Sequence, residues 1–341
     1  MYGNAYMPNL DAGRWWAFIA VFIFHFPINI SGALGVIKNG LYMGVDFFFI
    51  LSAFLLTHLA FDEIKRQKKF NALYFMQRRI CRIWPLYFFV VVAAYALAAL
   101  ANYWGQQSTL PPIIYYLSFT GNFYTQPHVF ILMFLWSIAI EEQYYILLAL
   151  YYKTNLFKVP LITLLLIITY IIFICLGHRQ HLYTHTLQYL PNIACGIWLA
   201  YAMHFKFEWF GKIARWRLWV LILVPLLCYI NAAPSGVMQI LLLKALSLMV
   251  FGSVVAYLAR TTFSSNQTFI YWGKRSYGLY IWHGVTLTIY AFVCKSNTFT
   301  GWQIAVAFLL CLLATHGLAW LCYRYIEMPF LRLKKHLPFL N

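Results

Sequence analysis

The segment from Arg14 to His25 reads RWWAFIAVFIFH, and no charged or titratable side chain lies between its two ends. Eleven residues make almost three turns of an α-helix, so the two end side chains lie within roughly 20° of each other and about 16 Å apart along the axis. If the helix crosses a membrane, Arg14 lies at one surface and His25 near mid-depth on the same face. An imidazole at that depth is costly and usually functional, and it can exchange protons near neutral pH.

The rest of the chain has the composition of a membrane protein. Hydrophobic residues make up 63% and charged residues 10% of its 341 residues, against about 25% charged residues in soluble domains. Apolar runs of about 20 residues, the span of a bilayer core, recur along it. They cover 14–33, 41–60, 83–103, 129–152, 159–176, 185–205, 216–231, 238–259, 275–294 and 301–325. We therefore expect an all-α, polytopic helical bundle of about ten transmembrane helices, forming one domain over residues 1–341.

The net charge of +17 follows the membrane topology and does not indicate nucleic-acid binding. If successive loops alternate between the two sides, only Lys38, Arg179 and Lys295 of the 25 Lys and Arg residues fall outside, and Lys244 falls inside a span. The other basic residues fall on the inner side, as the positive-inside rule requires. We expect both chain termini in the cytoplasm, and basic loops that contact anionic lipid headgroups.

Cysteine and histidine spacing gives no metal site. The seven cysteines contain no C-x-x-C pair and read as small apolar residues within spans. His178, His181 and His185 form a short tract without a fixed acidic companion, so no metal is expected. The N-terminus lacks the basic region and cleavage site of a signal peptide, which predicts that the first span is a retained anchor.

Several ionisable residues lie within the predicted spans. From a rise of about 1.5 Å per residue, His25, Asp46, Glu141 and His283 all fall in the middle third of a core about 30 Å thick. Together they could line one cavity and satisfy one another. The alternatives are structural: His283 could bond a backbone carbonyl of a neighbouring residue, and Asp46 and Glu327 could hold helices together.

Glu141 and Glu142 are adjacent on one helix and therefore point about 100° apart. Only one of them can face the cavity predicted for His25. Ser137 and Glu141 share a helical face, so we expect Glu141 nearer the imidazole and Glu142 paired with a neighbouring helix.

The predicted inner loop 61–82 ends in an arginine cluster. Arg78, Arg79 and Arg82 directly precede the third span, and Arg79 and Arg82 are neighbours on one helical face. Guanidinium groups bind phosphate through two parallel hydrogen bonds. Positive-inside anchoring alone is the alternative, but the position of the arginines favours a phosphate site at the inner mouth of the cavity.

Six motifs in this order resemble the acyltransferase 3 family, membrane enzymes that mostly O-acetylate bacterial surface glycans. The motifs are the Arg14-x10-His25 spacing, Gly44–Leu55, the pair Arg79 and Arg82 with Pro85 and Tyr87, Trp136–Tyr145, Ser276–His283 and Ile326–Pro329. The chain departs from the family pattern at Ala53, often Gly, at Tyr144, usually Phe, and at Met328, frequently Arg. The last departure removes a possible partner of Glu327. The chain resembles the stand-alone type, without an extracytoplasmic hydrolase-like domain.

The resemblance implies an O-acyltransferase, most often an O-acetyltransferase, in the bacterial inner membrane. Its donor is a cytoplasmic acyl-CoA, usually acetyl-CoA, and its acceptor is a hydroxyl of a surface or lipid-linked glycan, such as a lipopolysaccharide, at the periplasmic side. His25 is then the general base, and a carboxylate of Glu141, Glu142 or Asp46 orients it. An acyl-histidine intermediate is left open.

The remaining site residues follow from the same resemblance. Arg14, Arg78, Arg79 and Arg82 are expected to bind the acyl-CoA. Binding of the acceptor is expected from Trp136, Ser137, Tyr277 and His283.

A transporter or exporter of a small anion or lipid-linked substrate is the alternative function. Ten spans around a polar cavity would suit it equally well. The absence of an internal repeat and the arginine cluster favour the enzyme.

Overall fold

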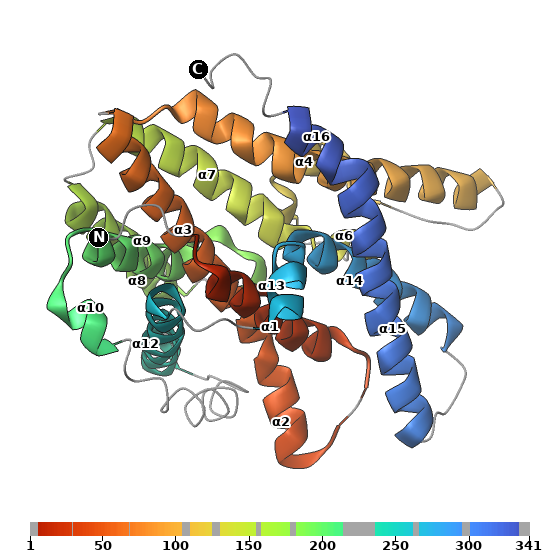
Figure 1. Cartoon of the computed structure of the whole chain (residues 1–341). Coiled ribbons are helices and arrows are strands. Elements are labelled where there is room, and N and C mark those ends of the chain that lie inside the picture. The colour runs from red at the N-terminus through yellow and green to blue at the C-terminus, as the bar shows by residue number, and fades with distance from the viewer. Residues whose placement is uncertain are drawn as a thin grey trace. The chain divides into compact units, whose positions relative to one another are not determined.

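The computed structural model describes most of the chain as helix, and the described residues contain no strand. The described ranges are 6–28, 30–67, 69–103, 110–124, 130–154, 158–177, 182–213, 236–261, 266–294 and 301–333. The chain divides into two compact units, and Figure 1 labels the longer helices of both. Unit 1 comprises Met1–His25, Asn29–Phe70 and Thr154–Lys274, and unit 2 comprises Phe26–Ile28, Asn71–Lys153 and Arg275–Asn341.

Unit 1 is a bundle around α3 and α9. Its helices are α1 (Pro8–His25), α2 (Gly32–Gly40), η1 (Leu41–Met43), α3 (Gly44–Gln67), α8 (Val159–Cys175), η4 (Leu182–Thr184), η5 (Thr186–Tyr189), α9 (Leu190–His204), α10 (Glu208–Ile213), α12 (Val237–Arg260) and α13 (Gln267–Gly273). Phe47, Ile50 and Phe54 of α3 meet Leu199 of α9 and Val255 of α12 in a continuous buried core. This core fixes α3, α9 and α12 against one another.

A glycine allows α9 to approach α3 closely. A Cβ atom on Gly196 would lie 2.3 Å from the carbonyl oxygen of Ile50 and 2.6 Å from the Cβ of Ala53. Ala53, where the related family often has Gly, is fully buried at this contact. Gly196 of α9 has no side chain, and this leaves room for the methyl group of Ala53 on α3.

Unit 2 contains the helices α4 (Ala72–Tyr103), α5 (Ile114–Leu117), η2 (Gly121–Phe123), α6 (Phe130–Met133), α7 (Trp136–Thr154), α14 (Ser276–Val293), α15 (Gly301–Cys322), η6 (Tyr323–Glu327) and α16 (Met328–Leu333). The segment η6 is a π-helix, a wider turn that is frequent at functional sites. Leu86, Phe134 and Leu279 are buried in the core of the unit. The hydroxyl of Tyr277 on α14 donates to the carbonyl of Ile83 on α4 at 2.6 Å, which ties these two helices together.

Three predicted boundaries are wrong. The first helix ends at His25 and not at residue 33, because Pro27 disfavours the helical conformation at the residue before it. The segment 61–82 is not a loop: α3 continues to Gln67 and α4 begins at Ala72, where the Asn71 side chain accepts from the backbone N–H of Tyr74 at 3.0 Å and caps the helix. The predicted span 129–152 is divided into α6 and α7.

Among the described residues, four helical stretches are long and apolar enough to cross a membrane: Gly32–Gln67, Ala72–Tyr103, Val237–Arg260 and Gly301–Leu333. Leu309, Leu310 and Leu313 of α15 are exposed, as expected of a helix that faces lipid. The chain is thus a helical membrane protein. The number of ten spans and the cytoplasmic termini stay predictions, and the predicted span 216–231 lies outside the described residues.

Candidate active site

His25 is the last residue of α1 and is half-buried in unit 1. Its ring packs against the ring of Phe24, with centroids 4.7 Å apart. The ammonium group of Lys38 on α2 donates to the carbonyl of Phe24 at 3.2 Å. Lys38 of α2 therefore bonds to the end of α1, next to the imidazole that the sequence predicts as general base.

Arg14 lies near the other end of α1 in a small charged network. Its Nη1 contacts Asp11 Oδ1 at 2.8 Å, and the hydroxyl of Tyr6 donates to Asp11 Oδ2 at 2.7 Å. Lys274 lies over the Tyr6 ring, 4.7 Å from its centroid. Partial burial, together with the hydrogen bond to Asp11, raises the pKa of the Tyr6 hydroxyl above its ordinary value. The Asp11 carboxylate thus binds both Arg14 and Tyr6. The predicted contact of Arg14 with the donor stays a prediction.

Asp46 belongs to a buried polar triad of unit 1. Its Oδ1 accepts from Lys244 Nζ of α12 at 2.7 Å and from Asn192 Nδ2 of α9 at 2.7 Å. Lys244 Nζ also donates to Asn192 Oδ1 at 3.2 Å. Asp46 is 5% exposed, Lys244 8% and Asn192 0%. The triad joins α3, α9 and α12, as the structural alternative for Asp46 predicts.

Lys244 and Asn192 are residues that sequence reasoning did not assign to a site. The sequence indicates that Lys244 has a partner, because a lysine inside an apolar span is costly when it is unpaired. The sequence does not single out Asn192, since an uncharged amide in a helix has many possible partners. Only packing could pair both residues with Asp46.

The predicted arginine cluster lies on α4 in unit 2. The guanidinium of Arg78 is 4.1 Å from the centroid of the Tyr74 ring, and that of Arg79 is 5.9 Å from the rings of both Phe75 and Tyr145. Arg78, Arg79 and Arg82 are all half-buried. The aromatic rings close to Arg78 and Arg79 restrict the orientation of these two guanidinium groups.

The two glutamates of α7 have different surroundings in unit 2. Glu142 is 1% exposed, and its Oε2 accepts from the indole N–H of Trp84 on α4 at 3.1 Å. This is a contact with a neighbouring helix, of the kind expected for Glu142. Glu141 is half-buried. The predicted role of either glutamate in orienting His25 stays a prediction.

The residues predicted to bind the acceptor also lie in unit 2. Ser137 donates to the hydroxyl of Tyr280 at 2.8 Å, which joins the start of α7 to α14. His283 is fully buried, contacts the Tyr280 carbonyl through Nδ1 and packs 4.4 Å from the Phe134 ring centroid. His283 thus makes the backbone-carbonyl bond that the sequence analysis gave as the structural alternative to a role in the site. Trp136 is buried, and Tyr277 binds α4 through Ile83.

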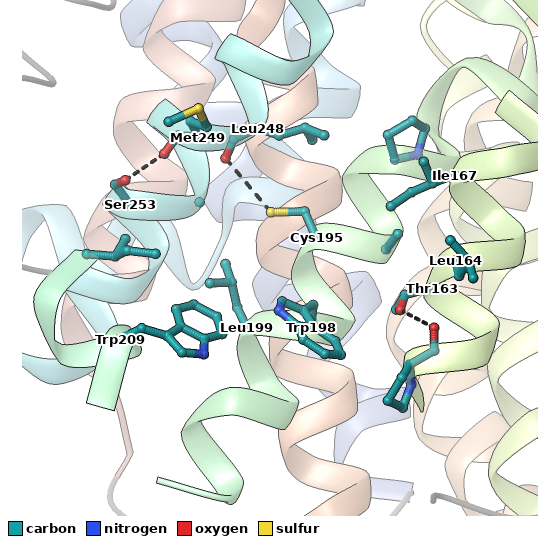
Figure 2. A pocket seen from close by; sticks show the side chains of 15 residues that line it. Thr163, Leu164, Ile167, Cys195, Trp198, Leu199, Trp209, Leu248, Met249 and Ser253 are labelled. Atoms are coloured by element: carbon teal, nitrogen blue, oxygen red, sulfur yellow. Dashed lines mark hydrogen bonds between the residues drawn. The ribbon is translucent and has the colours of Figure 1, made fainter. Parts of the chain in front are cut away.

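An apolar pocket of about 680 Å³ lies in unit 1 between α8, α9, α10 and α12 (Figure 2). Its polar side chains bond within the protein: Thr163 donates to the Val159 carbonyl at 3.0 Å and Ser253 to the Met249 carbonyl at 2.6 Å. Trp198 and Trp209 also line it. The described residues that line this pocket include none of the predicted site residues and no cation.

No cluster of three His, Cys, Asp or Glu residues suited to a metal occurs within the described ranges. His185 of the histidine tract accepts from the backbone N–H of Leu187 at 3.2 Å and stacks on Phe173. His178 and His181 lie outside the described residues.

The sequence matches the family model described as an acyltransferase domain over residues 7–324. The match covers nearly the whole chain and extends across both units. The protein is thus a helical membrane protein of the acyltransferase class, and the chain belongs to the acyltransferase 3 family that its motifs resemble.

The relatives carry related names. O-acetyltransferase OatA of Staphylococcus aureus (strain NCTC 8325 / PS 47) is 29% identical over 367 residues, which are 96% of this chain and 58% of that protein. A putative O-acetyltransferase of Staphylococcus aureus (strain MSSA476) is 28% identical over 373 residues, 95% of this chain and 57% of the relative. The chain spans a little over half the length of these relatives. A comparison with solved structures finds no match.

Proposed function

We propose that this protein is a membrane O-acyltransferase that moves an acyl group from cytoplasmic acyl-CoA to a glycan hydroxyl at the outer side of the bacterial inner membrane. The observation that carries the proposal is the acyltransferase-domain match over residues 7–324. The names of the relatives, both O-acetyltransferases, favour an acetyl group and an oxygen acceptor. Acetyl-CoA is therefore the proposed donor.

The nucleotide phosphates of the donor are assigned to unit 2. Arg78, Arg79 and Arg82 are held on one stretch of α4, with Arg78 and Arg79 supported by aromatic rings. This arrangement supports binding of the nucleotide phosphates, because a guanidinium whose rotamers are already restricted loses less entropy when it binds an anion. By the predicted topology these residues lie on the cytoplasmic side, where acyl-CoA is available.

His25 of unit 1 is the proposed general base. The imidazole removes the proton from a sugar hydroxyl as the oxygen attacks the thioester carbonyl carbon. The carbon–sulfur bond then breaks, and the CoA thiolate takes the proton from the imidazolium. The products are the O-acyl glycan, free CoA and neutral His25, so the histidine is ready for another cycle.

Asp46 is assigned a role in holding helices and not in the chemistry. Its Oδ1 already accepts from Lys244 and Asn192, both at 2.7 Å. A carboxylate with this ion pair is stabilised in place and less available to orient an imidazole.

Mass spectrometry of surface glycans tests the proposed function in the cell. Strains with the gene, without it and complemented by the wild-type gene are compared. We expect one class of glycan to lose the mass of an acyl group in the deletion strain and to regain it on complementation. Unchanged acylation of every glycan class, including lipid-linked intermediates, would contradict the proposal.

A further inference from the structure

Glu327 is a buried carboxylate of unit 2 that the proposed mechanism does not use. It is the last residue of the π-helix η6 and is 3% exposed. The preceding helix α15 is mostly exposed, and Arg324 and Tyr325 of the same π-helix are exposed too. The π-helical turn therefore directs this one acidic side chain into the unit.

Two cations of unit 2 act on this carboxylate. Arg82 of α4 and Arg275, directly before α14, both interact electrostatically with Glu327. Arg275 also lies over the ring of Tyr323, the first residue of η6, at 4.3 Å from its centroid. Met328 replaces a frequent Arg of the family, and the positive charges that act on Glu327 come from two other elements. Among the described residues Glu327 Oε1 has no hydrogen-bond partner, so the two arginines act on the carboxylate through their charge.

Gly278 provides the space for this carboxylate. A Cβ atom at Gly278 of α14 would lie 3.2 Å from Glu327 Oε1 and 3.5 Å from the Cβ of Ala319. One residue earlier, Tyr277 binds the carbonyl of Ile83, the neighbour of Arg82, at 2.6 Å. The elements that carry Arg82, Arg275 and Glu327 are therefore fixed at one place.

Arg82 and Arg275 are half-buried and Glu327 is buried. The two guanidinium groups and the one carboxylate together carry a net positive charge. Without Glu327 they would repel each other, and with it they can point together toward an anion from outside. All three residues belong to the predicted cytoplasmic ends of their helices. This is the side from which a nucleotide donor would arrive.

We propose that Arg275 joins Arg82 in binding the phosphates of the acyl-CoA, and that Glu327 positions both guanidinium groups. This inference rests on the proposed function and adds two residues to its donor site. Arg275 would touch the donor, whereas Glu327 is a positioning residue that acts through the arginines.

The test compares two donors in purified protein: acetyl-CoA, and acetyl-pantetheine, which has the thioester but no nucleotide phosphates. The variants are Arg275→Gln, Glu327→Gln and Gly278→Ala, the last of which crowds the carboxylate without changing a charge. We expect KM for acetyl-CoA to rise about tenfold or more in each variant, and KM for acetyl-pantetheine to stay at the wild-type value. Arg324→Gln removes an exposed charge from the same π-helix and is the matched control, with both values unchanged.

The outcomes separate the inference from the function. If both KM values rise equally, or neither rises in well-folded variants, the phosphate contact is absent and the inference is overturned. A loss of folded protein with normal kinetics in the folded fraction also overturns it, because the cluster would then be structural alone. If the wild type cleaves neither donor, the proposed function itself fails.

Discussion

Lys244 shows how this protein accommodates a cation inside an apolar helix. Its ammonium group is within 2.7 Å of Asp46 and 3.2 Å of Asn192, so both charges of the pair are hydrogen-bonded away from lipid. Removing one member leaves the other buried and uncompensated, which costs far more than removing both.

At the residue scale, we expect Lys244→Met and Asp46→Asn each to lower the free energy of unfolding by about 3–5 kcal/mol. The double variant should recover most of this loss, because no unpaired charge remains and the amide that replaces the Asp46 carboxylate can still bond Asn192. Thermal unfolding in one detergent measures all three variants. Additive losses in the double variant would show that the two side chains do not interact.

Turnover of the double variant, per folded molecule, tests the role of Asp46. Since Asp46 holds helices in our account, the folded double variant should retain activity. A folded but inactive double variant would instead assign the carboxylate to the chemistry.

The sequence shows which charged or titratable residues are costly to bury in an apolar helix, but not which residues they bind. A charge or imidazole in an apolar run is visible at once, as His25, Asp46 and Glu142 were. The partners Lys244, Asn192 and Trp84 come from helices far away in the chain, and no spacing rule connects them. For Glu327 the substitution at Met328 suggested a missing partner, whereas Arg82 and Arg275 act from other elements.

At the scale of elements, close packing of α9 on α3 depends on Gly196. Because a methyl group there would overlap the Ile50 carbonyl, Gly196→Ala should destabilise the protein by about 1–3 kcal/mol or more. Gly317→Ala on α15 is the matched control: among the described residues, no atom beyond its own helical turn lies within 4 Å of the added Cβ, so stability should change by less than about 1 kcal/mol. Equal unfolding temperatures for the two variants would refute the close contact.

The length of the apolar runs predicted which segments are helices, but it predicted less well where the helices begin and end. The helices α3, α4, α12 and α15 each contain most of a predicted span. The ends depend on local chemistry: Pro27 stops α1, and Asn71 caps α4 so that the arginines become helical. The π-helix η6 left no sequence signal, because no residue pattern of the chain distinguishes a π-turn from an α-helical turn.

At the scale of the whole molecule, the acyltransferase domain extends over two compact units. Unit 1 carries Arg14, His25 and the Asp46 triad, whereas unit 2 carries the arginine cluster of α4, both glutamates of α7 and the acceptor-binding candidates. Composition alone predicted a single domain of membrane helices over the chain. It could not predict a division into units, because each unit is assembled from segments that alternate along the sequence.

Release of CoA from acetyl-CoA by the purified protein tests the central claim most directly. A thiol reagent follows free CoA in detergent or lipid discs, for the wild type and for His25→Ala, with folding of both checked by thermal unfolding. We predict slow CoA release by the wild type and a rate about 10²–10⁴-fold lower for the folded His25→Ala variant, as expected when a general base is lost. A wild type that binds acetyl-CoA without releasing CoA, or a His25→Ala variant as active as the wild type, would contradict the account.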